Sequence, residues 1–83
     1  MAVEQDVVRL LDEVLGLGGR AATFVPETPL LGALPELDSM AVVGLLTALE
    51  ERFGFVIADD EIDGAVFATL GSFTRFVQDK LAS

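Results

Sequence analysis

The chain has 83 residues, of which 52% are hydrophobic, and it contains neither cysteine nor histidine. This supply of apolar side chains can fill the core of one small domain. The missing residue types exclude disulfides, a zinc site of the usual kind, and the Ser-His-Asp or Cys-His groupings of hydrolases. Fourteen acidic and five basic residues give a net charge of −9, which disfavours nucleic acid and anionic membranes and favours basic protein surfaces.

No targeting or membrane-spanning segment is expected. The N-terminal MAVEQD has neither a basic region nor a long apolar run, so it does not read as a signal peptide. The most apolar stretch, Met40 to Leu49, is too short to span a bilayer. We therefore expect a single domain over residues 1–83 that is cytoplasmic and monomeric and does not insert into a membrane.

The first predicted element is an amphipathic helix from Val3 to Leu15. Its apolar residues recur at the i, i+4, i+7 spacing that places them on one helical face. Gly16, Gly18 and Gly19 predict its end, because glycine readily adopts the left-handed conformation of a helix C-cap. The predicted inner stripe is Val3, Val7, Leu10, Leu11 and Val14, with Val8 and Leu15 beside it.

Residues 17–37 show no periodicity and contain all three prolines, which predicts a long loop. A loop of this length is unusual inside a compact domain unless its own side chains anchor it. We therefore expect an ordered crossing that is pinned to the core by apolar side chains, namely Phe24, Leu30, Leu31, Leu34 and Leu37.

A second helix is predicted from Ser39 to Arg52 or Phe53, with a stop at Gly54. Apolar residues spaced three and four apart define its inner face. The members of this face are Val42, Leu45, Leu46, Leu49 and Phe53.

Two further helices are predicted, and no segment alternates with the period of a strand. A short helix is expected around Asp59 to Asp63, and Thr69 is a good N-cap for the last one. The inner stripe of that last helix is Leu70, Phe73, Phe76, Val77 and Leu81. The fold class is therefore all-α: a small four-helix bundle of three main helices and one short helix, with a long loop between the first two.

Asp38-Ser39 stands directly before the second helix, and three interpretations of the serine compete. Asp38 or Ser39 can be an ordinary N-cap, although neither Ala41 nor Val42 supplies the glutamate of a capping box. A nucleophile is excluded, since the context is not G-x-S-x-G and no histidine is present to act as a base. The third interpretation is a modification site, where a phosphate ester would lie beside the unpaired N–H groups of the helix start.

The acidic stretch that begins at Asp59 matches a calcium-binding loop only in part. With Asp59 as the first position, Gly64 falls at the sixth, but Leu70 occupies the twelfth, where a bidentate glutamate is required. An EF-hand is therefore excluded and no metal site is assigned. Loose binding of a divalent cation is the lesser alternative to a solvated, acidic helix start.

The outward face of the second helix carries unusually little charge. Small and apolar residues that are followed one helical turn later by two glutamates are typical of a docking surface, whereas a purely solvated face usually carries more charge. Burial of this face under the long loop is the alternative explanation. The predicted partner-binding residues are Met40, Val43, Gly44, Thr47, Glu50 and Glu51.

The chain resembles the acyl carrier proteins over essentially its full length. LDSM is similar to the phosphopantetheine attachment motif of that family, usually Asp-Ser-Leu, with Met40 in place of the leucine. ALEERFGFVI resembles the end of the family's second helix and the turn after it. ADDEI resembles the Pro-Asp-Glu-Glu segment, and TLGSFTRFV resembles the last helix. The spacing of these segments makes the combination specific.

The resemblance implies a carrier that catalyses nothing itself. Ser39 would receive 4′-phosphopantetheine from coenzyme A through a separate magnesium-dependent phosphopantetheinyl transferase, and the thiol of this arm would hold an acyl group as a thioester. Asp38 matches the acidic residue that is associated with the metal during this transfer. The implied partners also include an acyl-loading ligase or synthase and acyltransferases, whose basic patches read the second helix. A bound fatty chain can be sheltered between the helices.

Two positions depart from the pattern of carriers in fatty acid synthesis. Those carriers usually have acidic residues where Ala41 and Gly44 stand here, and Gly44 costs a helix about 1 kcal/mol relative to alanine. The loss of charge favours a specialised lipid or secondary-metabolite pathway over housekeeping fatty acid synthesis. PLLGALPELDSMAVV is similar to carriers found beside bacterial exosortase systems. The alternatives are a peptidyl or aminoacyl carrier and an unmodified interaction module.

Overall fold

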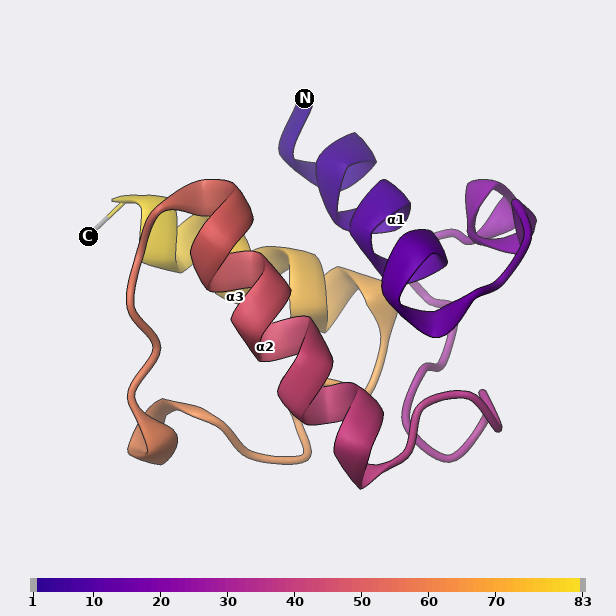
Figure 1. Cartoon of the computed structure of the whole chain (residues 1–83). Coiled ribbons are helices and arrows are strands. Elements are labelled where there is room, and N and C mark those ends of the chain that lie inside the picture. The colour runs from indigo at the N-terminus through magenta and orange to yellow at the C-terminus, as the bar shows by residue number, and fades with distance from the viewer. Residues whose placement is uncertain (1, 83) are drawn as a thin grey trace.

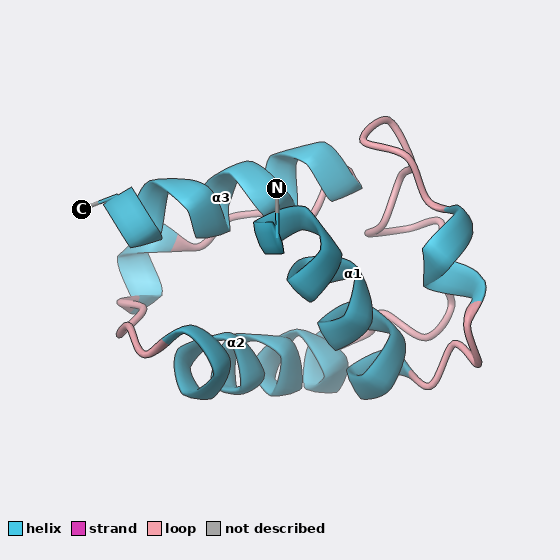
Figure 2. Ribbon diagram, turned by 90° about the horizontal axis from the view of Figure 1, so that it is seen from above, coloured by secondary structure: helices cyan, strands magenta, loops and turns pink. Residues whose placement is uncertain are grey.

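The structure, a computed structural model, describes residues 2–82, and α-helices make up most of them. In chain order, the elements are α1 (Ala2–Leu15), the 3-10 helix η1 (Arg20–Thr23), α2 (Ser39–Phe53), the 3-10 helix η2 (Asp59–Glu61) and α3 (Leu70–Ala82). Figure 2 shows α2 and α3 on two sides of the molecule with α1 crossing between them, and in Figure 1 α3 lies behind α2. The predicted all-α bundle is confirmed, and the bounds of α2 agree with the prediction.

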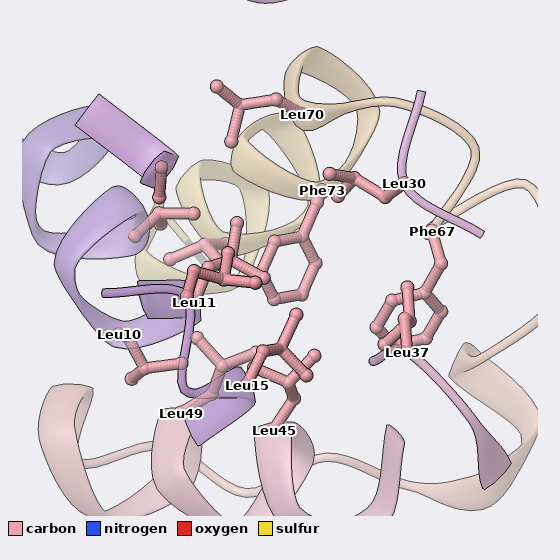
Figure 3. Packing of buried hydrophobic residues seen from close by; sticks show 14 residues of the cluster. Leu10, Leu11, Leu15, Leu30, Leu37, Leu45, Leu49, Phe67, Leu70 and Phe73 are labelled. Carbon is pink, nitrogen blue, oxygen red and sulfur yellow. The ribbon is translucent and has the colours of Figure 1, made fainter. Parts of the chain in front are cut away.

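The core lies where the three helices meet, and Phe73 of α3 is at its centre (Figure 3). Leu45 and Leu49 of α2 and Leu11 of α1 surround it and are fully buried. The predicted inner stripes are mostly confirmed, but two of their residues are wrong. Val14 is 36% exposed because it lies at the edge of the α1–α2 contact, and Leu81 is 43% exposed in the last turn of α3.

The first part of the long loop is shaped by one carboxylate of α1. Asp12 accepts hydrogen bonds from the N–H groups of Gly19, at 2.9 Å and 3.0 Å, and Ala21, at 3.2 Å. The chain can turn back on α1 because Gly16, Gly18 and Gly19 adopt positive φ angles, which glycine tolerates. These contacts form η1, which the sequence pattern did not indicate.

The middle of the loop is tied to the segment that leads into α3. Leu30 and Leu31 donate their N–H groups to Ala68 and Phe67, at 3.0 Å and 2.9 Å. Leu30 is fully buried, as predicted, but Leu31 is 47% exposed, because its neighbour takes the inward position and the chain turns at Gly32. Of the other predicted anchors, Leu37 is buried, and Phe24 and Leu34 are half-buried.

The connection between α2 and α3 contains little regular secondary structure, but hydrogen bonds hold it in place. Gly54, with a φ of 74°, ends α2 as predicted. The short helix is a 3-10 helix that ends at Glu61, two residues before the predicted end. It stops there because the Asp63 carboxylate accepts hydrogen bonds from the N–H groups of Ala65 and Val66, which turn the chain. None of the helices in residues 2–82 has the length and apolar character needed to cross a membrane.

Candidate functional site

The start of α2 is capped by Asp38 and not by Ser39. Asp38 has an extended backbone, with a φ of −104° and a ψ of −175°, and its Oδ1 accepts a hydrogen bond from the N–H of Ala41 at 2.8 Å. Its carbonyl accepts from Val42 at 3.0 Å. The cap interpretation is therefore correct for the aspartate, even without a capping box, and it leaves Ser39 as the first residue inside the helix.

Ser39 has an exposed side chain that the fold does not use. Within residues 2–82, its hydroxyl forms no hydrogen bond, and the N–H groups of Ser39 and Met40 have no acceptor. Unpaired N–H groups and the helix dipole make this end of α2 electropositive at short range. A phosphate ester on the Ser39 oxygen would therefore be stabilised where the serine stands.

The segment before the cap is held by both apolar and ionic contacts. Leu37 is buried, its N–H donates to Leu34 at 3.0 Å, and the N–H of Asp38 donates to Glu36 at 3.2 Å. The Glu36 carboxylate pairs with Arg20 of η1. Backbone hydrogen bonding lowers the pKa of the Glu36 carboxyl, partial burial opposes this effect, and the Arg20 guanidinium adds to the lowering. Glu36 therefore keeps its charge near the site.

The predicted docking residues do not all lie on one free surface. Met40 and Val43 are 78% and 60% exposed, and Thr47 is exposed with its hydroxyl bonded to the carbonyl of Val43 at 3.1 Å. These three form an uncharged strip along α2 that begins beside Ser39. Below, this set is called the α2 strip.

The other three predicted docking residues have different surroundings. Gly44 is half-buried at α1, where Val14 Cγ1 lies 3.6 Å from the position that a Cβ would take. Glu50 is half-buried, and its Oε2 accepts the N–H of Ile57 at 2.8 Å, so its charge serves the α2–α3 connection. Glu51 is exposed one helical turn after Thr47, where it also borders a shallow pocket shared with α1.

A groove of about 350 Å³ runs beside the α2 strip, between α2 and the α2–α3 connection. The wall opposite α2 is formed by Ile57, Ala58 and Ile62, which the sequence pattern did not indicate as part of a groove. The only sequence signal was an isoleucine inside an otherwise acidic segment. The lining residues are Val43, Leu46, Thr47, Glu50, Ile57, Ala58 and Ile62.

Comparison with known proteins places these features in a family. The family defined by a phosphopantetheine attachment site matches residues 5–77. The acyl carrier protein of Helicobacter pylori strain G27 is 35% identical over 83 residues, covering 99% of this chain and all of that protein. That of Helicobacter acinonychis strain Sheeba is 34% identical with the same coverage.

A solved structure agrees with these matches. The solution structure of the holo acyl carrier protein from Nitrosomonas europaea superposes with a TM-score of 0.91, at 49% identity and with complete coverage of both chains. The predicted cofactor, covalent 4′-phosphopantetheine, is confirmed at the level of the family, while the residue that carries it stays a prediction. Sequence, fold and an unused serine at a helix start agree, and the chain belongs to the acyl carrier protein family.

Proposed function

We propose that Ser39 carries the 4′-phosphopantetheine arm and that the protein presents acyl groups to partner enzymes without catalysing a reaction itself. The observation that carries this proposal is the exposed Ser39 hydroxyl, which forms no hydrogen bond within residues 2–82. The adjacent N–H groups of Ser39 and Met40 are available to a phosphate oxygen. When bound, the arm supplies a thiol on which an acyl group is held as a thioester.

Asp38 has two tasks in this proposal. One carboxylate oxygen caps α2 through Ala41, which orients the first helical turn and therefore Ser39. Its second oxygen receives no hydrogen bond from residues 2–82, so it can contact the metal that a phosphopantetheinyl transferase uses during transfer. The side chain is exposed, which makes it accessible to that enzyme.

The α2 strip is the proposed contact for partner enzymes. Met40 and Val43 offer exposed apolar area next to the modified residue, and Asp38 and Glu51 offer exposed acidic groups at its margins. This combination fits a partner with an apolar contact surface and basic residues around it. The phosphopantetheinyl transferase, an acyl-loading ligase or synthase and acyltransferases are the proposed partners.

The groove beside the strip supports an acyl cargo over an aminoacyl one. Leu46, Ile57 and Ile62 supply apolar walls that suit an acyl chain, and Glu50, the acidic residue of the lining, already accepts the N–H of Ile57 through its Oε2. The sparse charge on the strip supports a specialised pathway over housekeeping fatty acid synthesis. The cytoplasmic location remains a prediction.

The test is a mass measurement on modified protein. The purified chain is incubated with coenzyme A, magnesium and a broad-specificity phosphopantetheinyl transferase, and the intact mass is recorded. We expect the gain of one phosphopantetheinyl group by the wild type and by Ser72→Ala, which removes a half-buried serine at the start of α3. No gain is expected for Ser39→Ala.

The remaining outcomes identify the alternatives. An unmodified wild type indicates an interaction module, and a modified Ser39→Ala variant places the arm on another residue. Hydroxylamine treatment of the native protein, followed by identification of the released group, separates acyl from aminoacyl cargo.

A further inference from the structure

One ion pair joins the two ends of the long loop. Arg20 lies in η1, just after α1, and Glu36 lies just before the cap of α2; Arg20 Nη2 contacts Glu36 Oε2. The same guanidinium donates through Nε to the carbonyl of Leu17 at 3.2 Å. Since Leu17 is buried in the core, Arg20 connects a fixed point of the fold to the segment that precedes Ser39.

Glu36 depends on this pairing more than a freely solvated glutamate would. Its side chain is only 30% exposed, and its Oε1 is enclosed without a hydrogen-bond partner among residues 2–82. A partly enclosed carboxylate that loses its cation must either move toward water or keep its charge with only backbone hydrogen bonding to offset it. In this chain, Glu36 lies two residues before Asp38 and its carbonyl accepts the Asp38 N–H, so a movement that reaches the Glu36 backbone also reaches the cap.

The backbone provides a direct route from Glu36 to the serine. The Glu36 carbonyl accepts the N–H of Asp38 at 3.2 Å, and the Asp38 carboxylate and carbonyl cap α2 through Ala41 and Val42. Ser39 follows the cap directly, so its position is defined from that side only by this short segment and by the buried side chain of Leu37. A shift at Glu36 therefore reaches Ser39 through two residues.

We propose that Arg20 is a positioning residue for Ser39: through its ion pair with Glu36, it fixes the segment that presents the serine to the modifying enzyme. This inference rests on the proposed function, because it assigns Arg20 a role in the modification of Ser39. Arg20 itself touches neither the serine nor the cap. Its loss affects how often Ser39 is held in the reactive arrangement, and the global fold is affected little, since partly exposed ion pairs contribute modestly to stability.

The test measures the kinetics of phosphopantetheinyl transfer to Arg20→Gln, Glu36→Gln and the double variant. We expect Arg20→Gln to lower kcat by about three- to fivefold and to change KM by less than about twofold. The expected factor in kcat corresponds to the upper range of the free energy that a partly exposed ion pair contributes. Glu36→Gln should have a smaller effect because it leaves no carboxylate uncompensated. The double variant should be no slower than Arg20→Gln alone, since both substitutions break one interaction.

Hydrogen exchange provides a second readout. The N–H groups of Ala41 and Val42, which bond to Asp38, should exchange faster in Arg20→Gln, while that of Phe73 in α3 should be unchanged. Arg9→Gln is the matched control: Arg9 is an exposed arginine of α1 with no ion pair to residues 2–82, and its loss should leave kinetics and exchange at wild-type values.

Several outcomes would overturn the inference. A rise in KM with kcat unchanged would mark Arg20 as a contact for the transferase. Effects of Arg20→Gln and Glu36→Gln that simply multiply in the double variant would show that the two residues act independently. Faster exchange across the whole chain would show a general loss of stability. If the wild type itself gains no phosphopantetheinyl group, the proposed function fails. Exchange at Ala41 and Val42 then decides alone whether Arg20 fixes the start of α2.

Discussion

The starts of α2 and α3 each have a serine in the first helical turn, but their backbone N–H groups are paired differently. At α3, Leu70 and Gly71 donate their N–H groups to Thr28 and Pro26, at 2.9 Å and 2.8 Å, and Ser72 donates to the Thr69 side chain at 3.1 Å. At α2, Asp38 satisfies two N–H groups, and those of Ser39 and Met40 have no acceptor in residues 2–82. One helix start is closed by its own chain and the other is left open.

The two serines make the contrast sharper. The Ser72 hydroxyl donates toward the carbonyls of Val66 and Thr69, at 3.0 Å and 2.9 Å, and accepts the N–H of Thr69. The Ser39 hydroxyl has no such partner among the described residues. Hydrogen bonds of this kind fix a side chain and make it structural, whereas an unused hydroxyl on an ordered helix start is available for chemistry. Both serines lie in the first turn of a helix, Ser39 as the first residue of α2 and Ser72 as the third residue of α3, and hydrogen bonding separates their roles.

Ser72→Ala gives the largest expected change in stability. The variant leaves the Thr69 N–H without its acceptor and removes the bonds to two carbonyls, which should destabilise the protein by about 1–2 kcal/mol. A melting temperature lower by about 4–8 °C per kcal/mol, with Ser39 still fully modified, would support the contrast. If Ser39→Ala destabilised the protein equally, the two helix starts would not differ in the way described.

Gly71→Ala tests how tightly the start of α3 is closed. An added Cβ would lie 3.0 Å from the Pro26 carbonyl oxygen, which also accepts the Gly71 N–H, so Pro26 cannot move away without lengthening that bond. We expect a net loss of about 1 kcal/mol, measured by urea unfolding, because this crowding exceeds the gain in helix propensity.

Gly44→Ala is the matched substitution in α2. The added Cβ would meet Val14 at an ordinary contact distance of 3.6 Å, so the gain in propensity should raise the stability by about 0.5–1 kcal/mol. A change of the same sign at both glycines would contradict the difference in packing between the two helices.

The smallest expected effect concerns acid. A hydrogen bond from the Ala58 N–H and the ion pair with Lys80 lower the pKa of Glu61 from its ordinary value of 4.5. The ionised group therefore stabilises the fold fully above that value, and this contribution is lost as the pH falls through the lowered pKa. When the pH is lowered from 6 to 3, the melting temperature of Glu61→Gln should fall by less than the melting temperature of the wild type. Glu27→Gln, at an exposed loop position, should follow the wild type.

Local signals were sufficient for the helices and for the position of Ser39 at the start of α2. The bounds of α2 follow from an apolar period, from Asp38 before it and from Gly54 after it, all of which lie within the segment. The surroundings of Gly44 and Glu50 could not be predicted in this way. The first is set by the crossing of α1 and the second by a hydrogen bond to the α2–α3 connection. The helical period gives the direction of a side chain but does not show which neighbour it meets.

The same limit explains η1. Its formation depends on the Asp12 carboxylate, which reaches N–H groups seven and nine residues further along the chain, and no sequence period reports such a contact. Leu31 differs for a related reason: Leu30 and Leu31 are equally apolar, and only the ladder to Phe67 and Ala68 decides which of them turns inward. The groove wall at Ile62 is likewise a product of tertiary packing.

The backbone ties between the long loop and the start of α3 have a consequence for the order of folding. Each of these hydrogen bonds joins two residues that are far apart in the sequence, such as Leu30 with Ala68 and Gly71 with Pro26. Contacts of this kind form late, because the long segment between the two residues must first be closed into a loop. During synthesis on the ribosome, α1 and α2 emerge before these partners exist. The middle of the loop between α1 and α2 can therefore be tied in place only after the segment that leads into α3 has been synthesised, so this part of the loop is among the last to become ordered.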